Sequence, residues 1–317
     1  MTELPEETLT QLRPMEARLR AAVSRGAAEE AIEIAGEIQQ LFSDRRHHRL
    51  LKAKLWAFEA ALDANRLAYA ETGFIGVRKL ANRGTRIHLE ATSLLAVCLL
   101  RQKKNTEAKR AIREVIQNLD DIASDRSRHK FQKRFIERIE QECILAELIG
   151  TDTSPLDAAE MHRHAVRLVQ YNSDNEILRL IGNAVPSSSI KLLQDVRHYS
   201  IKLLPLPDRK LLPSPGDTEK PLSVGKRTAA VLKRIAWKSL CDPDSEVYKL
   251  WSKKVPAVFN GGYFAGALAT TMAAWRIGIP IIGTGVAAIA MKSSAEVFCE
   301  FAKPEGMMID RSERDEE

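Results

Sequence analysis

Residues 94–115 read "LLAVCLLRQKKNTEAKRAIREV", and this stretch indicates the fold. Its apolar residues recur at three- and four-residue spacing, which places them on one face of an α-helix. The polar run at 103–105 breaks the pattern, and the same spacing resumes after it. Small residues such as Ala96 and Ala108 lie on the apolar faces, where they would let two antiparallel helices approach closely. The stretch therefore predicts a helical hairpin.

Similar hairpins are indicated on both sides of this stretch. Their anchor alanines are Ala31, Ala68, Ala108 and Ala158, separated by 37, 40 and 50 residues. The pattern resembles the tetratricopeptide repeat, in which helical hairpins of about 34 residues stack into a solenoid. The Trp, Tyr and terminal Pro of that family's consensus are missing from the best copy, at 94–115. The resemblance implies a surface for a protein or peptide partner; the alternative is an ordinary helical bundle.

The chain divides by composition into five segments. We expect an all-α protein with a solenoid over 1–204, a linker at 205–222, basic amphipathic helices at 223–254, an apolar helical hairpin at 255–302 and an acidic tail at 303–317. The linker holds five of the 13 prolines. Proline-rich stretches interrupt helices and mark domain boundaries.

Composition and cysteine spacing indicate a cytosolic protein. Of the 317 residues, 44% are hydrophobic and 28% are charged, and the net charge is +6. The four cysteines are widely spread with no CxxC pair, which is typical of free, buried thiols in a reducing compartment. The first residues, "MTELPEETLTQL", lack the basic and apolar regions of a secretory signal.

No catalytic, metal or cofactor signature is present. His47 and His48 are adjacent, and His162 and His164 are two apart. On a helix the members of each pair point to different faces, so neither pair can coordinate one metal ion. The glycine-rich stretch 278–285, "GIPIIGTG", lacks the Lys-Ser/Thr end of a phosphate-binding loop. We therefore expect no enzyme activity, no metal site and no cofactor.

The stretch 255–291 contains one formal charge, Arg276. Whether this stretch lies in a bilayer or in a protein core decides between the possible functions. The run before this arginine is 21 residues long, enough for a membrane-spanning helix of about 20 residues. The run after it, 277–291, is short. The hairpin therefore fits a bilayer, while a buried hairpin in a soluble helical domain is the alternative.

Flanking and small residues favour the bilayer. The expected membrane-interface residues are Trp251, Trp275, Lys253, Lys254 and Lys292, because tryptophan and lysine are enriched where a span meets the headgroups. Four small residues at four-residue spacing form a stripe on which helices can pack closely and chains can assemble. These are Gly262, Gly266, Thr270 and Ala274.

The basic segment before the hairpin predicts contact with an anionic surface. Its candidate contacts are Lys226, Arg227, Lys233, Arg234 and Lys238. Lipid headgroups are favoured because an uncharged stretch follows. Nucleic acid is the less favoured partner, because no nucleic-acid-binding motif accompanies the charges. A solvated helix face is the third interpretation.

The sequence thus leads to one main functional expectation and an alternative. The main expectation is a membrane effector or anchor on the cytoplasmic side of a membrane, forming homo-oligomers and binding a protein partner on its solenoid. This layout is similar to that of microbial defence and cell-death effectors. The alternative is a soluble cytoplasmic adaptor whose hairpin is core or a partner interface.

Overall fold

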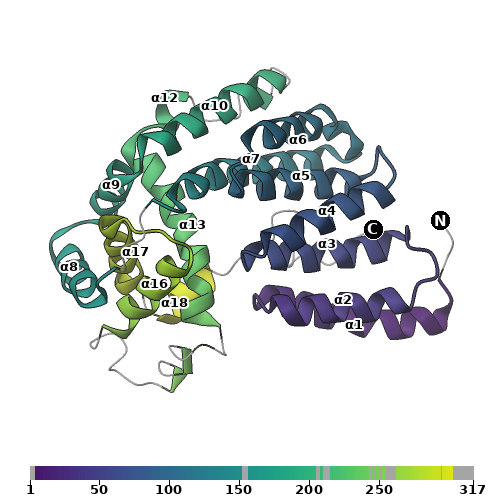
Figure 1. Cartoon of the computed structure of the whole chain (residues 1–317), viewed down its shortest axis with the longest axis horizontal. Coiled ribbons are helices and arrows are strands. Elements are labelled where there is room, and N and C mark those ends of the chain that lie inside the picture. The colour runs from purple at the N-terminus through teal and green to yellow at the C-terminus, as the bar shows by residue number, and fades with distance from the viewer. Residues whose placement is uncertain are drawn as a thin grey trace. The chain divides into compact units, whose positions relative to one another are not determined.

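The computed structural model shows an all-helical chain, as the sequence predicts (Figure 1). The residues it describes are 4–151, 156–204, 208–209, 215–242, 245, 248–249, 252–253, 262–293 and 295–302. The chain forms two compact units, and the division between them falls at Ile139 and Glu140. This division lies inside helix α7 (Asp125–Leu148) and not at the proline-rich segment.

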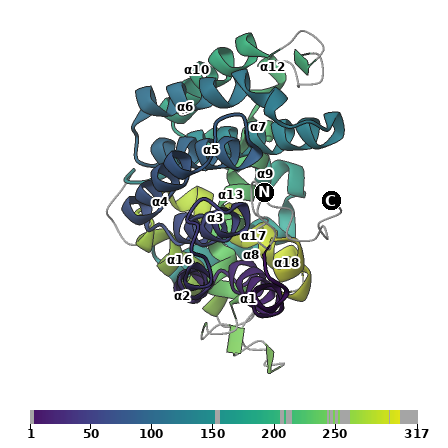
Figure 2. The same cartoon turned by 90° about the vertical axis from the view of Figure 1, so that its right-hand side faces the viewer.

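The N-terminal unit is a stack of three helical hairpins. Figures 1 and 2 both show the hairpins α1/α2, α3/α4 and α5/α6 one above another in chain order. Each helix packs on the next along the chain, and α3 also packs on α1 and α5. The helices are α1 (Glu6–Ser24), α2 (Ala28–Gln40), α3 (His48–Asp63), α4 (Leu67–Leu80), α5 (Arg86–Arg101) and α6 (Asn105–Gln117), followed by η1 (Leu119–Asp121).

The turn inside each hairpin is the same. Gly26, Asn65 and Lys103 all have positive φ, of 73°, 61° and 60°. In each case the next residue donates its N–H to the carbonyl five residues back, as in the bond from Arg66 to Ala61. This bond and the left-handed residue end a helix by satisfying its last carbonyls. The three turns are 39 and 38 residues apart, so the repeat is more regular than the sequence indicates.

One anchor alanine differs from its prediction. Ala31, Ala70 and Ala108 occupy equivalent positions, each five residues after the positive-φ residue of its turn, and all three are fully buried. Ala68, the predicted anchor, is exposed. Periodicity alone does not distinguish two alanines in "LAYA"; the turn at Asn65 sets the register.

The C-terminal unit contains the rest of α7 and all later helices. They are α8 (Ala158–Tyr171), α9 (Asp174–Ala184), α10 (Ser187–Leu203), α12 (Pro215–Thr218), α13 (Pro221–Cys241), α16 (Tyr263–Ala274), α17 (Pro280–Lys292) and α18 (Ala295–Phe301). α13 packs on α9, and α17 packs on both α8 and α9. The segment after α7 therefore shares one core with the basic and apolar segments, which explains why the division falls earlier than the linker.

Glycines allow the closest helix contacts in this unit. A Cβ atom on Gly225 of α13 would lie 1.8 Å from the carbonyl oxygen of Leu178 in α9. A Cβ atom on Gly182 of α9 would lie 1.9 Å from the carbonyl oxygen of Pro221. The two backbones therefore touch at a crossing where any side chain would be excluded.

The apolar hairpin forms part of the core of the C-terminal unit. Residues 282–290 of α17 are all buried, so this helix is covered on every side. α16 buries Phe264, Leu268 and Met272 in the same core. None of the described helices has both the length and the apolar character needed to cross a bilayer. Residues 254–261, where the first predicted span begins, lie outside the described residues.

A disulfide corrects the expectation of four free thiols. Cys241, the last residue of α13, is bonded to Cys299 in α18. Cys98 and Cys143 are buried thiols outside any disulfide. The indole Nε1 of Trp237 also donates to the carbonyl of Cys299 over 2.8 Å. Spacing along the chain does not reveal this pair, because its members are 58 residues apart and meet through the packing of α18 on α13.

We expect the disulfide to stabilise the C-terminal unit measurably. The Cys241→Ser/Cys299→Ser variant should unfold with a free energy about 2–4 kcal/mol lower, because the bond closes a long loop in the unfolded chain. Urea titration with and without reductant measures this. Reductant should lower the midpoint of the natural chain and leave the double variant unchanged. Four reactive thiols in the unreduced, denatured chain would contradict the bond.

Candidate functional site

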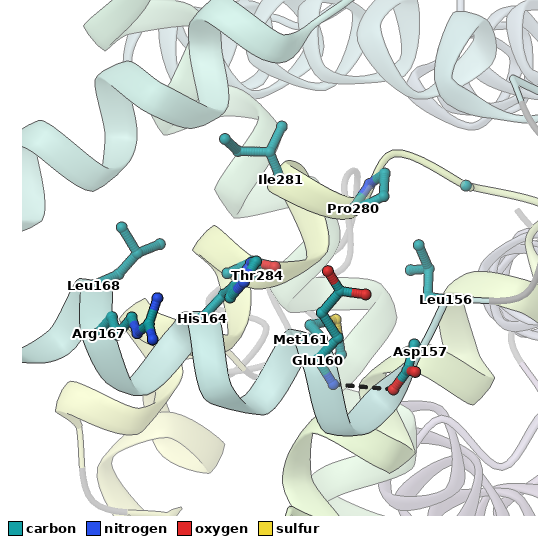
Figure 3. Close-up of a pocket in the computed structure, with 11 residues that line it drawn as sticks. Leu156, Asp157, Glu160, Met161, His164, Arg167, Leu168, Pro280, Ile281 and Thr284 are labelled. Atoms are coloured by element: carbon teal, nitrogen blue, oxygen red, sulfur yellow. Dashed lines mark hydrogen bonds between the residues drawn. The ribbon is translucent and has the colours of Figure 1, made fainter.

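A groove between α8 and the start of α17 is the candidate site (Figure 3). Its volume is about 590 Å³, within the range of roughly 300–1,000 Å³ that is usual for binding pockets. The α8 side is lined by Leu156, Asp157, Glu160, Met161, His164, Arg167 and Leu168, and the α17 side by Gly278, Pro280, Ile281 and Thr284.

Helix starts position both walls of the groove. Asp157 caps α8, and its carboxylate accepts the backbone N–H of Glu160 over 2.9 Å. The lining residues of α8 then recur at helical spacing, so they share one face. Pro280 is the first residue of α17, where its missing N–H costs nothing. The α17 wall therefore begins sharply after the extended residue Ile279.

The floor of the groove is apolar, and one apolar side chain projects beside it. Met161 and Thr284 are buried at its base. Ile281 is 44% exposed, although a large aliphatic side chain is normally covered. Figure 3 shows Ile281 and Pro280 on α17 standing across the groove from the side chains of α8. An apolar floor with an exposed apolar edge is typical of a binding surface.

Among the described residues that line the groove, the charged ones all lie on the α8 side. Asp157, Glu160, His164 and Arg167 follow one another along the helix, and all four are exposed (Figure 3). The hydrogen bond from the Glu160 N–H lowers the pKa of Asp157, so this carboxylate is ionised at neutral pH. The α17 residues that line the groove are uncharged. The rim is thus acidic toward the start of α8 and basic toward its end.

The predicted small-residue stripe lies on the surface of the C-terminal unit. Thr270 and Ala274 are exposed, and Gly262 and Gly266 are partly exposed. Among the described residues, no atom beyond the backbone of its own helix lies within 4 Å of a Cβ atom placed on Gly266. The close helix contacts that glycine permits occur instead at Gly182 and Gly225. The stripe's role in assembly stays a prediction.

The predicted membrane-interface residues are only partly described. Lys253 is exposed and Trp275 is half-buried, while Trp251 and Lys254 lie outside the described residues. The Lys292 ammonium donates to the carbonyl of Asn172 over 2.6 Å and to the Asp174 carboxylate over 2.9 Å. Lys292 therefore ties the end of α17 to the start of α9 within the unit.

The predicted anionic-surface residues divide between interior and solvent. Arg227 pairs with Glu140 over 2.8 Å, and Arg234 pairs with Glu142 over 2.9 Å, so these two face α7. Lys233 is half-buried, and burial lowers its pKa although Asp174 opposes the shift. Lys226 is exposed, and the side chain of Lys238 is not among those described. Arg227 and Arg234 are therefore paired with carboxylates of α7 within the unit, and contact of the five residues with an anionic surface stays a prediction.

The groove itself was missed in the sequence. The sequence predicts part of the apolar hairpin at its α17 wall and a repeat helix at its α8 wall, and neither prediction brings the two walls together. The sequence signal that could have indicated the groove is the row of charged residues on α8 beside apolar Met161 and Leu168. Among the residues that the structure describes, no three His, Cys, Asp or Glu side chains gather closely enough to hold a metal ion.

Comparison with known proteins adds no family to this picture. The chain matches no protein-family model, and no curated protein and no solved structure is significantly similar to it.

Proposed function

We propose that this protein is a helical-repeat adaptor that binds a segment of a partner protein, and that the α8/α17 groove receives apolar side chains of that segment. The observation that carries the proposal is the groove with its apolar floor, its exposed Ile281 and its charged rim. Protein-binding surfaces commonly combine an apolar centre with a polar rim. Tyr171, which is 80% exposed, follows Leu168 by one turn of α8 and lengthens the apolar edge.

The repeated hairpins of the N-terminal unit support the same proposal. Stacked helical hairpins bury their core through their neighbours and leave their outer faces for partners. The N-terminal unit holds three such hairpins with equivalent turns. In the proposed function these hairpins bind partner proteins, and the groove binds without catalysing a reaction.

The membrane-effector hypothesis requires a larger change in the molecule. α17 would have to leave a site where residues 282–290 are all buried, and Lys292 would have to leave Asp174. Burial of apolar residues stabilises this position by roughly 25 cal/mol for each Å² covered. We therefore propose the adaptor and keep membrane insertion as the outcome that would replace it.

The adaptor function predicts peptide binding that depends on Ile281. Peptides selected on the full chain from a display library should bind the Ile281→Glu variant about tenfold more weakly or worse, because the exposed apolar contact at the edge of the groove is lost and a charge is placed there. Fluorescence anisotropy with labelled peptides measures the dissociation constants.

Val297→Glu provides the matched control. Val297 lies on α18 and is also 44% exposed, but it does not line the groove. Peptide affinity should be unchanged in this variant. Selection of no peptide sensitive to Ile281→Glu, together with dye leakage from anionic vesicles caused by the natural chain, would replace the adaptor with the membrane effector.

A further inference from the structure

The charged rim of the groove has a fixed polarity. Asp157 and Glu160 lie in the first turn of α8, and Arg167 lies two turns further on (Figure 3). In the described part of the chain, neither the Glu160 carboxylate nor the Arg167 guanidinium has an ion-pair partner. Both are exposed on the face of α8 that lines the groove. They are therefore available to charges on an occupant.

The opposite wall does not cancel this polarity. Its lining residues, Gly278, Pro280, Ile281 and Thr284, carry no charge. The start of α17 adds a partial positive charge near Pro280 of about half a unit. This partial charge is smaller than the combined negative charge of Asp157 and Glu160 at that end of α8. The charge pattern of the occupant is thus set by α8.

The shape of the site favours a helical occupant. The groove is built from two helix surfaces, and the helices that form it offer no strand edge. An extended peptide would leave its backbone groups without partners there, whereas a helix satisfies its own. Glu160 and Arg167 are about 10 Å apart along α8 at ~1.5 Å per residue. This distance equals two turns of the occupant.

We propose that the groove binds an amphipathic helix of a partner protein, antiparallel to α8, with an acidic residue near its N-terminal end and a basic residue two turns later. This inference rests on the proposed function and gives the chemistry of the partner. The basic residue faces Glu160 and the acidic residue faces Arg167. Antiparallel packing opposes the two helix dipoles favourably, and an acid before a base also stabilises the partner helix itself.

A charge-coded peptide library tests the proposal on the full chain. The peptides are about 16 residues long, a length at which helices become marginally stable in isolation. On one face of the peptide helix, each position is either leucine or isoleucine. Two flanking positions, two turns apart, carry Glu or Lys in all four combinations. The natural chain should enrich Glu-then-Lys over Lys-then-Glu peptides, with about tenfold tighter binding of matched pairs.

A charge-exchanged protein should reverse that preference. Glu160→Lys/Arg167→Glu swaps the two exposed charges and leaves the apolar floor intact. It should enrich Lys-then-Glu peptides, with an unchanged melting midpoint as the folding control. High salt should reduce the preference in both proteins because the charges are exposed, while Ile281-dependent binding persists.

The outcomes separate this inference from the proposed function. Enrichment that is lost in Ile281→Glu but does not depend on charge order would overturn the inference and leave the adaptor function. Preference of the natural chain for Lys-then-Glu peptides would overturn the antiparallel orientation. Absence of any Ile281-dependent enrichment in all four combinations would overturn the proposed function itself.

Discussion

Gly225→Ala should unfold or severely destabilise the C-terminal unit, with an expected cost of about 3 kcal/mol or more. Overpacking a core costs about 1–3 kcal/mol when side chains can adjust. Here the added methyl group would meet the backbone carbonyl of Leu178 at 1.8 Å, so α9 and α13 must move apart as whole helices. Urea titration of the full chain, followed by circular dichroism, measures the loss.

Gly266→Ala is the matched control, with the opposite expected sign. Gly266 also lies within a helix, but in the described part of the chain no atom beyond its own helix backbone lies within 4 Å of the added methyl group. Replacing glycine by alanine inside a helix should stabilise it by about 0.5–1 kcal/mol. If both variants lose similar stability, the close α9/α13 crossing is wrong. A loss in Gly266→Ala alone would show that the stripe on α16 is covered, as the assembly hypothesis requires.

The second large effect is expected for Glu140→Ala. The Glu140 carboxylate accepts a hydrogen bond from Arg197 over 2.7 Å with one oxygen and from Arg227 over 2.8 Å with the other. It thereby joins α7, α10 and α13. Burial lowers the pKa of Arg197, and the Glu140 carboxylate opposes this shift. Alanine would remove the carboxylate that these two buried or partly buried guanidinium groups share, at a cost of about 3–5 kcal/mol.

Two comparisons isolate the buried pair. Asp217→Ala breaks the pair with Lys220, in which both side chains are more than half exposed, so it should cost at most about 1 kcal/mol. Adding Arg197→Met and Arg227→Met to Glu140→Ala should recover part of the lost stability, because the buried charges that Glu140 neutralised are removed as well. Equal costs for Glu140→Ala and Asp217→Ala would mean that Glu140 is solvated and not buried.

The helices of the N-terminal unit and the turn at Gly26 could be predicted from the sequence because their causes are local. The apolar spacing of 94–115 is the spacing of α5 and α6, and Gly26 ends its helix because glycine tolerates positive φ. The repeat was therefore recognisable, although the exact anchor in α4 was not. Alanine-rich faces likewise indicated close helix contacts. These features depend on neighbours within a few residues, which the sequence displays directly.

The apolar hairpin shows where local information ends. A helix buried in protein and a helix buried in lipid need the same apolar composition. "GIPIIGTGVAAIAM" is therefore compatible with either environment, and only the packing of α17 on α8 and α9 places it in the core of the C-terminal unit. The same holds for small residues: the sequence drew attention to Gly262 and Gly266, whereas the backbones meet at Gly182 and Gly225.

The partners of polar groups and the groove were decided by tertiary structure alone. Arg227 lies 87 residues from Glu140, and Cys241 lies 58 residues from Cys299. The two walls of the groove, around Met161 and Ile281, are still further apart along the chain. Periodicity determines which face of a helix is apolar, but it carries no information about which other face will cover it. That choice depends on the path of the whole chain, because contacts between distant segments form only when the helices between them are packed.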